Sequence, residues 1–262
     1  MGKCDSSKTR VVPVFNHLLE LDRTGAPWLD RLIRLGSRTD LATVPPALGQ
    51  VMNSLPSWGK GNEKPLPAPK ELHEWLVQNI SPEAVGKNEV TEKSQKKRVA
   101  LAAGDPEVLS EALFCLSQVP AGKVLRAKWF IFEGPSKPDA FFVTSTFILV
   151  VEGKRKETSL DTETTWMANR PQLIRHMDGA MAIAEGRTVL SMLLVEGDSD
   201  DPMTVPLKWT RELEEHLQPD QLALSLPHRS DIERQIIVNG VLGIATWQRV
   251  CSEFSIHWPP AA

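Results

Sequence analysis

Residues 137–154, KPDAFFVTSTFILVVEGK, decide the fold predicted for this chain. Two runs rich in β-branched and aromatic residues flank the polar triplet TST at 144–146, a pattern typical of two strands joined by a tight turn. A hairpin that turns inside this triplet pairs Val143 with Ile148. The passage therefore predicts an antiparallel strand pair with an apolar body.

The same register places Asp139 on one strand opposite Glu152 on the other. Opposed residues of an antiparallel pair point to the same face of the sheet, with Cβ atoms about 4.5–5.5 Å apart. Side chains alternate along a strand, so Lys154 is expected on that face as well. The sequence thus predicts two carboxylates and an ammonium group close together at the end of the hairpin.

Two carboxylates in such a pair repel each other, and a divalent cation would remove that cost. Carboxylate oxygens without imidazole or thiolate ligands favour Mg²⁺ or Mn²⁺ over zinc. A metal ion held there can polarise a phosphate and lower the pKa of a bound water, which Lys154 would orient or deprotonate. This chemistry suits the hydrolysis of phosphodiester bonds.

These residues resemble the PD-(D/E)xK nuclease superfamily, which has the restriction-endonuclease-like fold. Pro138 and Asp139 look like its PD element, and Glu152, Gly153 and Lys154 look like its ExK element. The resemblance implies that Asp139, Glu152 and the backbone carbonyl of Gly153 bind the metal. It further implies that Lys154 acts on the attacking water.

The resemblance also implies two further catalytic candidates. Glu111 lies on the helix expected before the hairpin, where the superfamily often has an acidic residue. Gln172 lies on the helix expected after it, and residues 172–176, QLIRH, are similar to a Q-x-x-x-Y pattern. His176 stands where Tyr is usual, so it is interpreted as packing or bridging polar groups. Three basic residues are candidate contacts to nucleic acid: Arg170, Arg175 and Lys156.

The surrounding sequence predicts an α/β fold with a restriction-endonuclease-like mixed β-sheet flanked by helices, and an additional helical N-terminal region. Residues 1–80, with a Pro- and Gly-rich crossing at 55–70, are expected to form that region, and residues 81–262 the nuclease-like domain. Further strands are expected at 124–132 and 188–195. Helices are expected from 71 to 79, 105 to about 116, 170 to about 184, 207 to 217, and 230 to about 254 with a break at Gly240 or Gly243.

Composition excludes several classes of protein. The chain has 262 residues and a net charge of −3, and it lacks the GxSxG, GxGxxG and HExxH patterns, which disfavours serine hydrolases, nucleotide-dependent enzymes and zinc proteases. Residues 87–156 carry 12 Lys and Arg against eight Asp and Glu, so a local basic surface is expected on an acidic protein. Cys4, Cys115 and Cys251 are odd in number and far apart, which indicates reduced thiols.

These observations predict a cytoplasmic, Mg²⁺-dependent (or Mn²⁺-dependent) deoxyribonuclease with DNA as its partner and no membrane association. A homodimer is one expectation, because a dimer cuts both strands of a duplex more easily. Two alternatives remain open. One is a catalytically inactive module of the same fold that binds nucleic acid or protein partners, and the other is a hydrolase of a small phosphorylated substrate.

Overall fold

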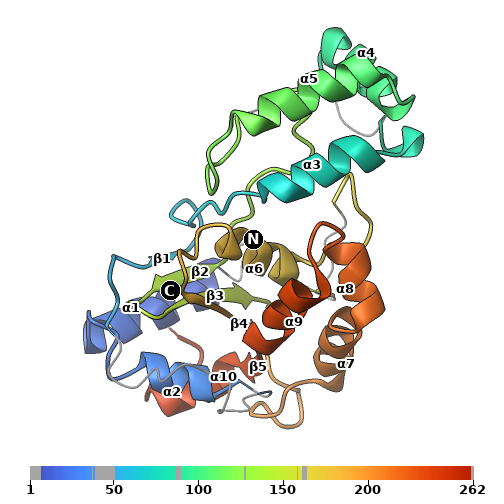
Figure 1. The fold of residues 1–262 in the computed structure, drawn as a ribbon. Coiled ribbons are helices and arrows are strands. Elements are labelled where there is room, and N and C mark those ends of the chain that lie inside the picture. Colours follow the sequence, from blue (N-terminus) through green and yellow to red (C-terminus); the bar gives the residue numbers. More distant parts are fainter. Residues whose placement is uncertain are drawn as a thin grey trace.

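The computed structural model describes residues 7–36, 38, 51–85, 90–126, 128–157, 159–160 and 164–260. This part of the chain is an α/β protein built on a five-stranded mixed sheet in the order β1-β2-β3-β4-β5 (Figure 1). The three strands β1, β2 and β3 are antiparallel neighbours, whereas β3, β4 and β5 run parallel. The strands are β1 (Ser57–Trp58), β2 (Ala140–Val143), β3 (Phe147–Gly153), β4 (Thr188–Val195) and β5 (Val241–Thr246).

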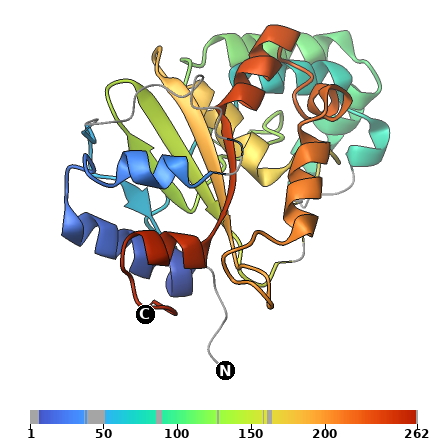
Figure 2. The same cartoon turned by 90° about the horizontal axis from the view of Figure 1, so that it is seen from below.

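The N-terminal and C-terminal helices cover one face of the sheet, as Figure 2 shows. They pack on the odd-numbered side chains of β3, such as Leu149 and Val151, through Phe15, Trp28 and Trp247. Burial of these large apolar groups is the main stabilising contribution of this layer. The helices are η1 (Ser7–Val11), α1 (Val12–Leu21), α2 (Leu29–Arg34) and α10 (Trp247–Glu253).

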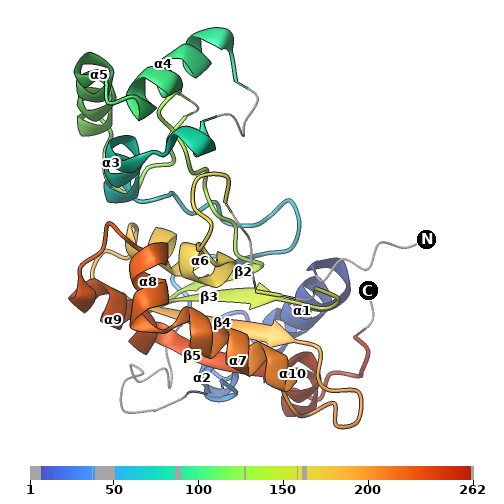
Figure 3. The same ribbon diagram turned by 90° about the vertical axis from the view of Figure 1, so that its right-hand side faces the viewer.

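Four other helices cover the opposite face, where the even-numbered side chains of β3 point (Figure 3). Ile148 and Val150 of β3 meet Leu173 and Met177 of α6 there. Because β3 and β4 are buried on both faces, both strands read as nearly continuous apolar runs. The helices are α6 (Gln172–Met181), α7 (Leu207–His216), α8 (Pro219–Ser225) and α9 (Asp231–Gly240).

A separate group of helices, called here the inserted helical unit, lies between β1 and β2 in the chain and stands beyond the end of the sheet (Figure 1). It has a core of its own, which includes Leu72, Leu116 and Phe130. Asp105 begins its helix α5 as the sequence predicts, since its side chain accepts from the backbone N–H groups of Glu107 and Val108. The unit contains α3 (Lys70–Asn79), η2 (Pro82–Ala84), α4 (Glu92–Ala102) and α5 (Pro106–Ser117).

The hairpin register is confirmed. Val143 pairs with Ile148 and Ala140 pairs with Val151, as the sequence predicts. Thr144 closes the turn, because its hydroxyl accepts from the backbone N–H of Phe147 at 3.0 Å. The last pair is Ala140 and Val151, so the next residues along the two strands are Asp139 and Glu152, at the open end of the hairpin.

Three sequence predictions about the elements are wrong. Among its described residues, segment 124–132 forms no strand, because its aromatic side chains fill the core of the inserted helical unit. The first strand is instead β1, which lies in the segment expected to be an irregular crossing. Residues 241–246 are strand β5 and not part of a long helix, since the helix ends at Gly240.

The packing does not follow the expected division at residue 80. Helices α1 and α2 share one core with β2 to β5, so the N-terminal helices belong to the sheet layer. Helix α3 packs with α5 in the inserted helical unit. The units of packing are therefore the layered sheet and the inserted unit, which interrupts it.

In the described ranges, no helix has the length and apolar character needed to cross a membrane. Cys115 and Cys251 are free thiols, as expected, and Cys4 lies outside the described residues.

Candidate active site

The end of the β2–β3 hairpin brings together the side chains that the sequence singles out. Asp139 directly precedes β2, whereas Glu152 and Gly153 end β3 and Lys154 follows it. Helix α6 contributes Gln172 to the same place. Four of the five predicted catalytic residues and all three predicted metal ligands therefore meet at one end of the sheet.

Asp139 lies against the backbone of the opposite strand. Its Oδ2 accepts from the N–H of Gly153 at 2.8 Å. Burial raises the pKa of Asp139 to about 8, and the negative charge of Glu152 adds to this rise. The ionised form of this carboxyl group is thus unfavourable, and a nearby cation would stabilise it.

Glu152 is only 3% exposed, and both of its oxygens have partners. Lys154 Nζ lies 2.9 Å from Oε1, and His176 Nε2 lies 3.1 Å from Oε2. Although burial opposes the ionised form, the contacts with His176 and Lys154 lower the pKa of Glu152 below its usual value. The two opposed acids therefore differ: Glu152 is held as the anion, while Asp139 favours a proton or a cation.

Lys154 is 6% exposed, and both its side chain and its backbone have hydrogen-bond partners. Its Nζ donates to Oε1 of Gln172 at 3.0 Å, in addition to its ion pair with Glu152. Its backbone carbonyl accepts from the indole N–H of Trp247 at 3.1 Å, and its backbone N–H donates to Leu194. The ammonium group is consequently positioned by β3 and α6, while α10 and β4 hold the backbone of Lys154.

Gly153 is required by the close approach of its neighbours. An added Cβ would lie 2.7 Å from the Trp247 ring and 3.1 Å from Val11, closer than normal packing allows. It would also lie 3.2 Å from Oδ2 of Asp139. The glycine between Glu152 and Lys154 thus lets the indole and the Asp139 carboxylate reach the strand.

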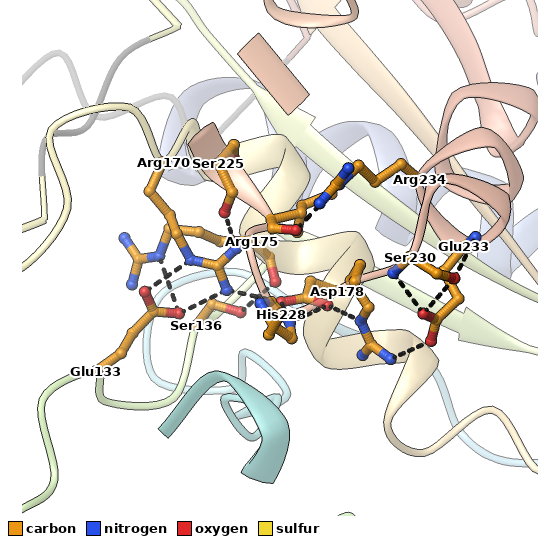
Figure 4. A network of polar contacts seen from close by, with 12 residues as sticks. Glu133, Ser136, Arg170, Arg175, Asp178, Ser225, His228, Ser230, Glu233 and Arg234 are labelled. Atoms are coloured by element: carbon orange, nitrogen blue, oxygen red, sulfur yellow. Dashed lines mark hydrogen bonds and ion pairs between the residues drawn. The ribbon is translucent and has the colours of Figure 1, made fainter. Parts of the chain in front are cut away.

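Helix α6 is anchored by a buried network of charges, shown in Figure 4. Arg170, which precedes the helix, binds Glu133 through Nε at 2.9 Å and Asp178 through Nη2 at 2.7 Å. Asp178 in turn accepts from Arg229 Nε at 2.9 Å and contacts His228. Although burial opposes it, the charge of Arg170 helps to keep the pKa of Asp178 well below its usual value. The network fixes the helix that carries Gln172 and His176.

Two predicted site residues lie elsewhere. Arg170 is 1% exposed and its guanidinium is consumed by the buried network, so its predicted contact with nucleic acid is wrong. Glu111 lies on α5 in the inserted helical unit and is paired with Lys97, so the structure does not bring it to the hairpin end. The periodic pattern correctly predicts that Glu111 lies on an amphipathic helix before the hairpin. That helix, α5, does not cover the sheet, because α1 and α2 are the earlier helices that pack on it.

The other two candidate nucleic-acid contacts lie nearer the surface. Lys156 is exposed just beyond the end of β3. Arg175 is half-buried on α6, with Nε 3.8 Å from Glu133. Their contact with nucleic acid remains a prediction. Both residues lie on segments that also carry residues of the candidate active site.

Sequence reasoning missed the interactions of Trp247 and Glu157. Trp247 begins α10, within the segment that was predicted to be one long helix, so no pattern pointed to it. Glu157 adds negative charge near Asp139 and contributes to its raised pKa. His176, interpreted as packing or bridging polar groups, is buried and contacts Glu152 through Nε2, while its Nδ1 has no hydrogen-bond partner among the described residues.

Within the described ranges, no group of three or more His, Cys, Asp and Glu side chains is arranged to hold a metal ion. The hairpin end offers two carboxylates and one backbone carbonyl, a set of oxygen donors that suits a hard divalent cation. Compared with known proteins, the chain matches no family model, no curated protein and no solved structure.

Proposed function

We propose that this protein is a metal-dependent nuclease that hydrolyses DNA phosphodiester bonds on a restriction-endonuclease-like fold. One observation carries the proposal: Asp139 and Glu152 lie at the same end of the hairpin, where Asp139 Oδ2 accepts from the Gly153 N–H at 2.8 Å and Lys154 Nζ lies 2.9 Å from Glu152. The order of hairpin, helix α6 and parallel strand β4, with helices on both faces, supports the fold. DNA is the proposed partner and the cytoplasm the proposed compartment, in keeping with the free thiols.

Asp139, Glu152 and the carbonyl of Gly153 would hold Mg²⁺ or Mn²⁺. The donor set fits, because the two acids are buried together and burial raises the pKa of Asp139 to about 8, so that its ionised form requires a nearby cation. Bound there, the ion would supply Lewis-acid stabilisation of a phosphate and acidify a water molecule. His176 keeps Glu152 oriented through Oε2, so the ion would bind Asp139 and take Oε1 of Glu152 from its ion pair with Lys154.

The remaining residues orient the reacting groups. The Lys154 ammonium would direct the attacking water and stabilise the negative charge that develops on the phosphate. Gln172 holds that ammonium at 3.0 Å independently of Glu152, so Lys154 stays in place when an oxygen of Glu152 is taken by the ion. Trp247 fixes the strand end from the opposite face.

The test incubates the protein with linear, circular and single-stranded DNA in the presence of Mg²⁺ or Mn²⁺. We expect cleavage by the natural protein and a loss of at least about 100-fold in Asp139→Asn and Lys154→Met, since each removes a group that acts in the transition state. Glu214→Gln is the matched control, because this exposed acid lies on α7, away from both the hairpin end and the inserted helical unit. Cleavage that persists in Asp139→Asn and Lys154→Met would contradict the proposal.

One observation favours the alternative of a DNA-binding module without turnover. Both oxygens of Glu152 already have protein partners, so the site can also be stable as a closed ion-pair cluster. DNA binding without cleavage of any of the three substrates would support this alternative. Turnover of a small phosphoester without DNA binding would support the third candidate.

A further inference from the structure

A groove of about 410 Å³ lies on the inserted helical unit, away from the residues of the candidate active site. Thr91 and Ser94 line it from the N-terminal end of α4. Lys128 and Trp129 line it from the segment that follows α5. The groove is therefore a second polar site, built from residues that the hairpin does not use.

Arg98 also lines this groove and carries an uncompensated charge. It is 4% exposed, and its Nε and Nη2 donate to the backbone carbonyls of Trp129 at 2.7 Å and Ile131 at 3.3 Å. Its Nη1 has no partner, and no carboxylate pairs with it, in the part of the chain that the structure describes. Buried guanidinium groups are normally paired with an acid, so this unpaired charge favours an anion in the groove.

Aromatic rings hold the guanidinium in place without neutralising it. The Arg98 Cζ lies 4.8 Å from the Trp166 ring centroid and 5.4 Å from that of Phe132. Such contacts stabilise a buried cation much less than pairing with a carboxylate does. The positive charge at the wall of the groove therefore remains available to an external anion.

The N-terminus of α4 supplies an independent attraction for an anion. Thr91 caps this 11-residue helix by accepting from the N–H of Ser94. The N-terminal end of a helix carries partial positive charge and unpaired N–H groups, which bind phosphate. Glu92 in the first turn is exposed and paired with Lys96 at 2.7 Å, so the helix end is not neutralised from inside the groove.

The neighbouring charges leave Lys128 as the accessible cation. Lys97 lies over the Trp129 ring but is paired with Glu111, so that pair is neutral as a unit. Lys128 is exposed, lies 5.9 Å from the Phe130 ring centroid, and has no ion pair among the described residues. Two cations, Arg98 behind the wall and Lys128 at the rim, thus face the groove together with the end of α4.

We infer that this groove binds a phosphate group of a nucleic-acid strand at a distance from the bond that is cleaved. The Lys128 ammonium and the N–H groups at the start of α4 would donate to the phosphate oxygens, and the Arg98 charge would stabilise the anion from behind. Half-buried Trp129 would offer an apolar wall to the adjoining sugar or base. The anion site stands on its own contacts, whereas its assignment to a strand rests on the proposed function.

The test measures binding of a short labelled single-stranded oligonucleotide by fluorescence anisotropy, in EDTA and over a series of salt concentrations. Lys128→Met should lower the slope of log affinity against log salt by about 0.7, the loss of one phosphate contact on a single strand. Arg98→Met should weaken binding by about tenfold, the effect of removing a buried positive charge behind the bound anion, and its melting curve reports whether it folds.

Lys208→Met is the matched control, because Lys208 is also exposed over an aromatic ring, 4.5 Å from Trp209, but lies outside the groove. An equal salt slope in Lys128→Met and Lys208→Met would overturn the inference. Lys128-dependent binding of inorganic phosphate without any oligonucleotide binding would overturn the assignment to a strand. Because no divalent cation is present, either result is independent of cleavage, so the nuclease proposal is tested separately.

Discussion

The two opposed acids of the hairpin differ because their partners differ. Glu152 is contacted by Lys154 and His176, whereas Asp139 has the N–H of Gly153. Their pKa values consequently move in opposite directions, with Asp139 raised to about 8 and Glu152 lowered. Environments that separate the pKa values of adjacent acids are typical of functional sites.

Gly153→Ala should destabilise the fold. The added methyl group would overlap the Trp247 ring and Val11, and overpacking of this kind costs about 1–3 kcal/mol. Urea denaturation measures the free energy of unfolding. Gly134→Ala is the control, since an added Cβ there meets no atom within 4 Å, and its stability should stay the same or rise by up to about 1 kcal/mol. Equal stabilities of the two variants would contradict this account of Gly153.

His73 should make the protein less stable in mild acid. Burial lowers the pKa of His73 to about 4, against the charge of Glu133, while Arg170 and His228 lower it further. Between pH 6.5 and pH 4 His73 binds a proton in the unfolded chain but not in the folded chain, so the contribution of His73 to stability falls as the pH drops through this window. The loss should reach up to about 3 kcal/mol by pH 4.

The measurement compares denaturation of the natural protein and His73→Leu between pH 7 and pH 5, above the range where ordinary carboxylates titrate. The stability of the variant relative to that of the natural protein should rise as the pH falls, because Asp139 and the other titrating groups contribute equally to both proteins. A relative stability that does not change with pH would exclude this contribution of His73.

At the scale of elements, α6 connects the buried network to the candidate active site. Asp178 anchors the helix near its C-terminal end, and Gln172 and His176 face the hairpin from its first half. The two contacts with the hairpin come from positions i and i+4, which lie on one side of a helix. A rotation of α6 would therefore remove both contacts at once.

Asp178→Asn should destabilise the protein by about 3–5 kcal/mol, because it leaves the buried charges of Arg170 and Arg229 partly unpaired. Thermal or urea denaturation measures this loss. Lys96→Met breaks an exposed ion pair with Glu92 and should cost about 0.5 kcal/mol or less. Similar losses in the two variants would show that the network does not anchor α6.

The hairpin could be predicted because it is local. Its two apolar runs and the short polar turn between them fix the register, and the pairing of Ala140 with Val151 brings Asp139 and Glu152 to the same end of the hairpin. Strand β4 and helix α6 were also predicted, since β4 is a continuous apolar run and α6 has a clear apolar face. These features depend on neighbours in the sequence, which a pattern can show.

The rest depends on tertiary contacts. β1 has only two residues and exists because Ser57 and Trp58 pair with the edge of β2. β5 reads as the continuation of a helix, yet its residues complete the parallel sheet beside β4. Arg170 resembled a surface arginine, because nothing in the local sequence shows that Glu133 and Asp178 surround it.

On the scale of the whole molecule, the chain has two kinds of core. The sheet is packed on both faces, and the inserted helical unit has an apolar centre of its own around Leu72 and Leu116. The candidate active site belongs to the sheet, and the groove with Arg98 belongs to the inserted unit. Under the proposed function, this arrangement would separate the cleavage site from a second contact with the nucleic acid.

Leu116→Ala should destabilise the inserted unit by about 2–5 kcal/mol, the usual cost of a cavity at a fully buried leucine. Amide hydrogen exchange should speed up in α5 while β4 keeps its protection. Phe114→Ser on the same helix is the control, because Phe114 is 66% exposed and should have little effect. Faster exchange in β4 to the same extent would show that the two cores unfold as one.

Anomalous diffraction from a crystal soaked in Mn²⁺ tests most directly whether Asp139 and Glu152 hold a metal ion. We expect one strong anomalous peak within about 2.0–2.5 Å of carboxylate oxygens of both Asp139 and Glu152, and no peak there in Asp139→Asn. A crystal without a peak at the hairpin end, in which Lys154 and His176 still hold both oxygens of Glu152, would contradict this expectation.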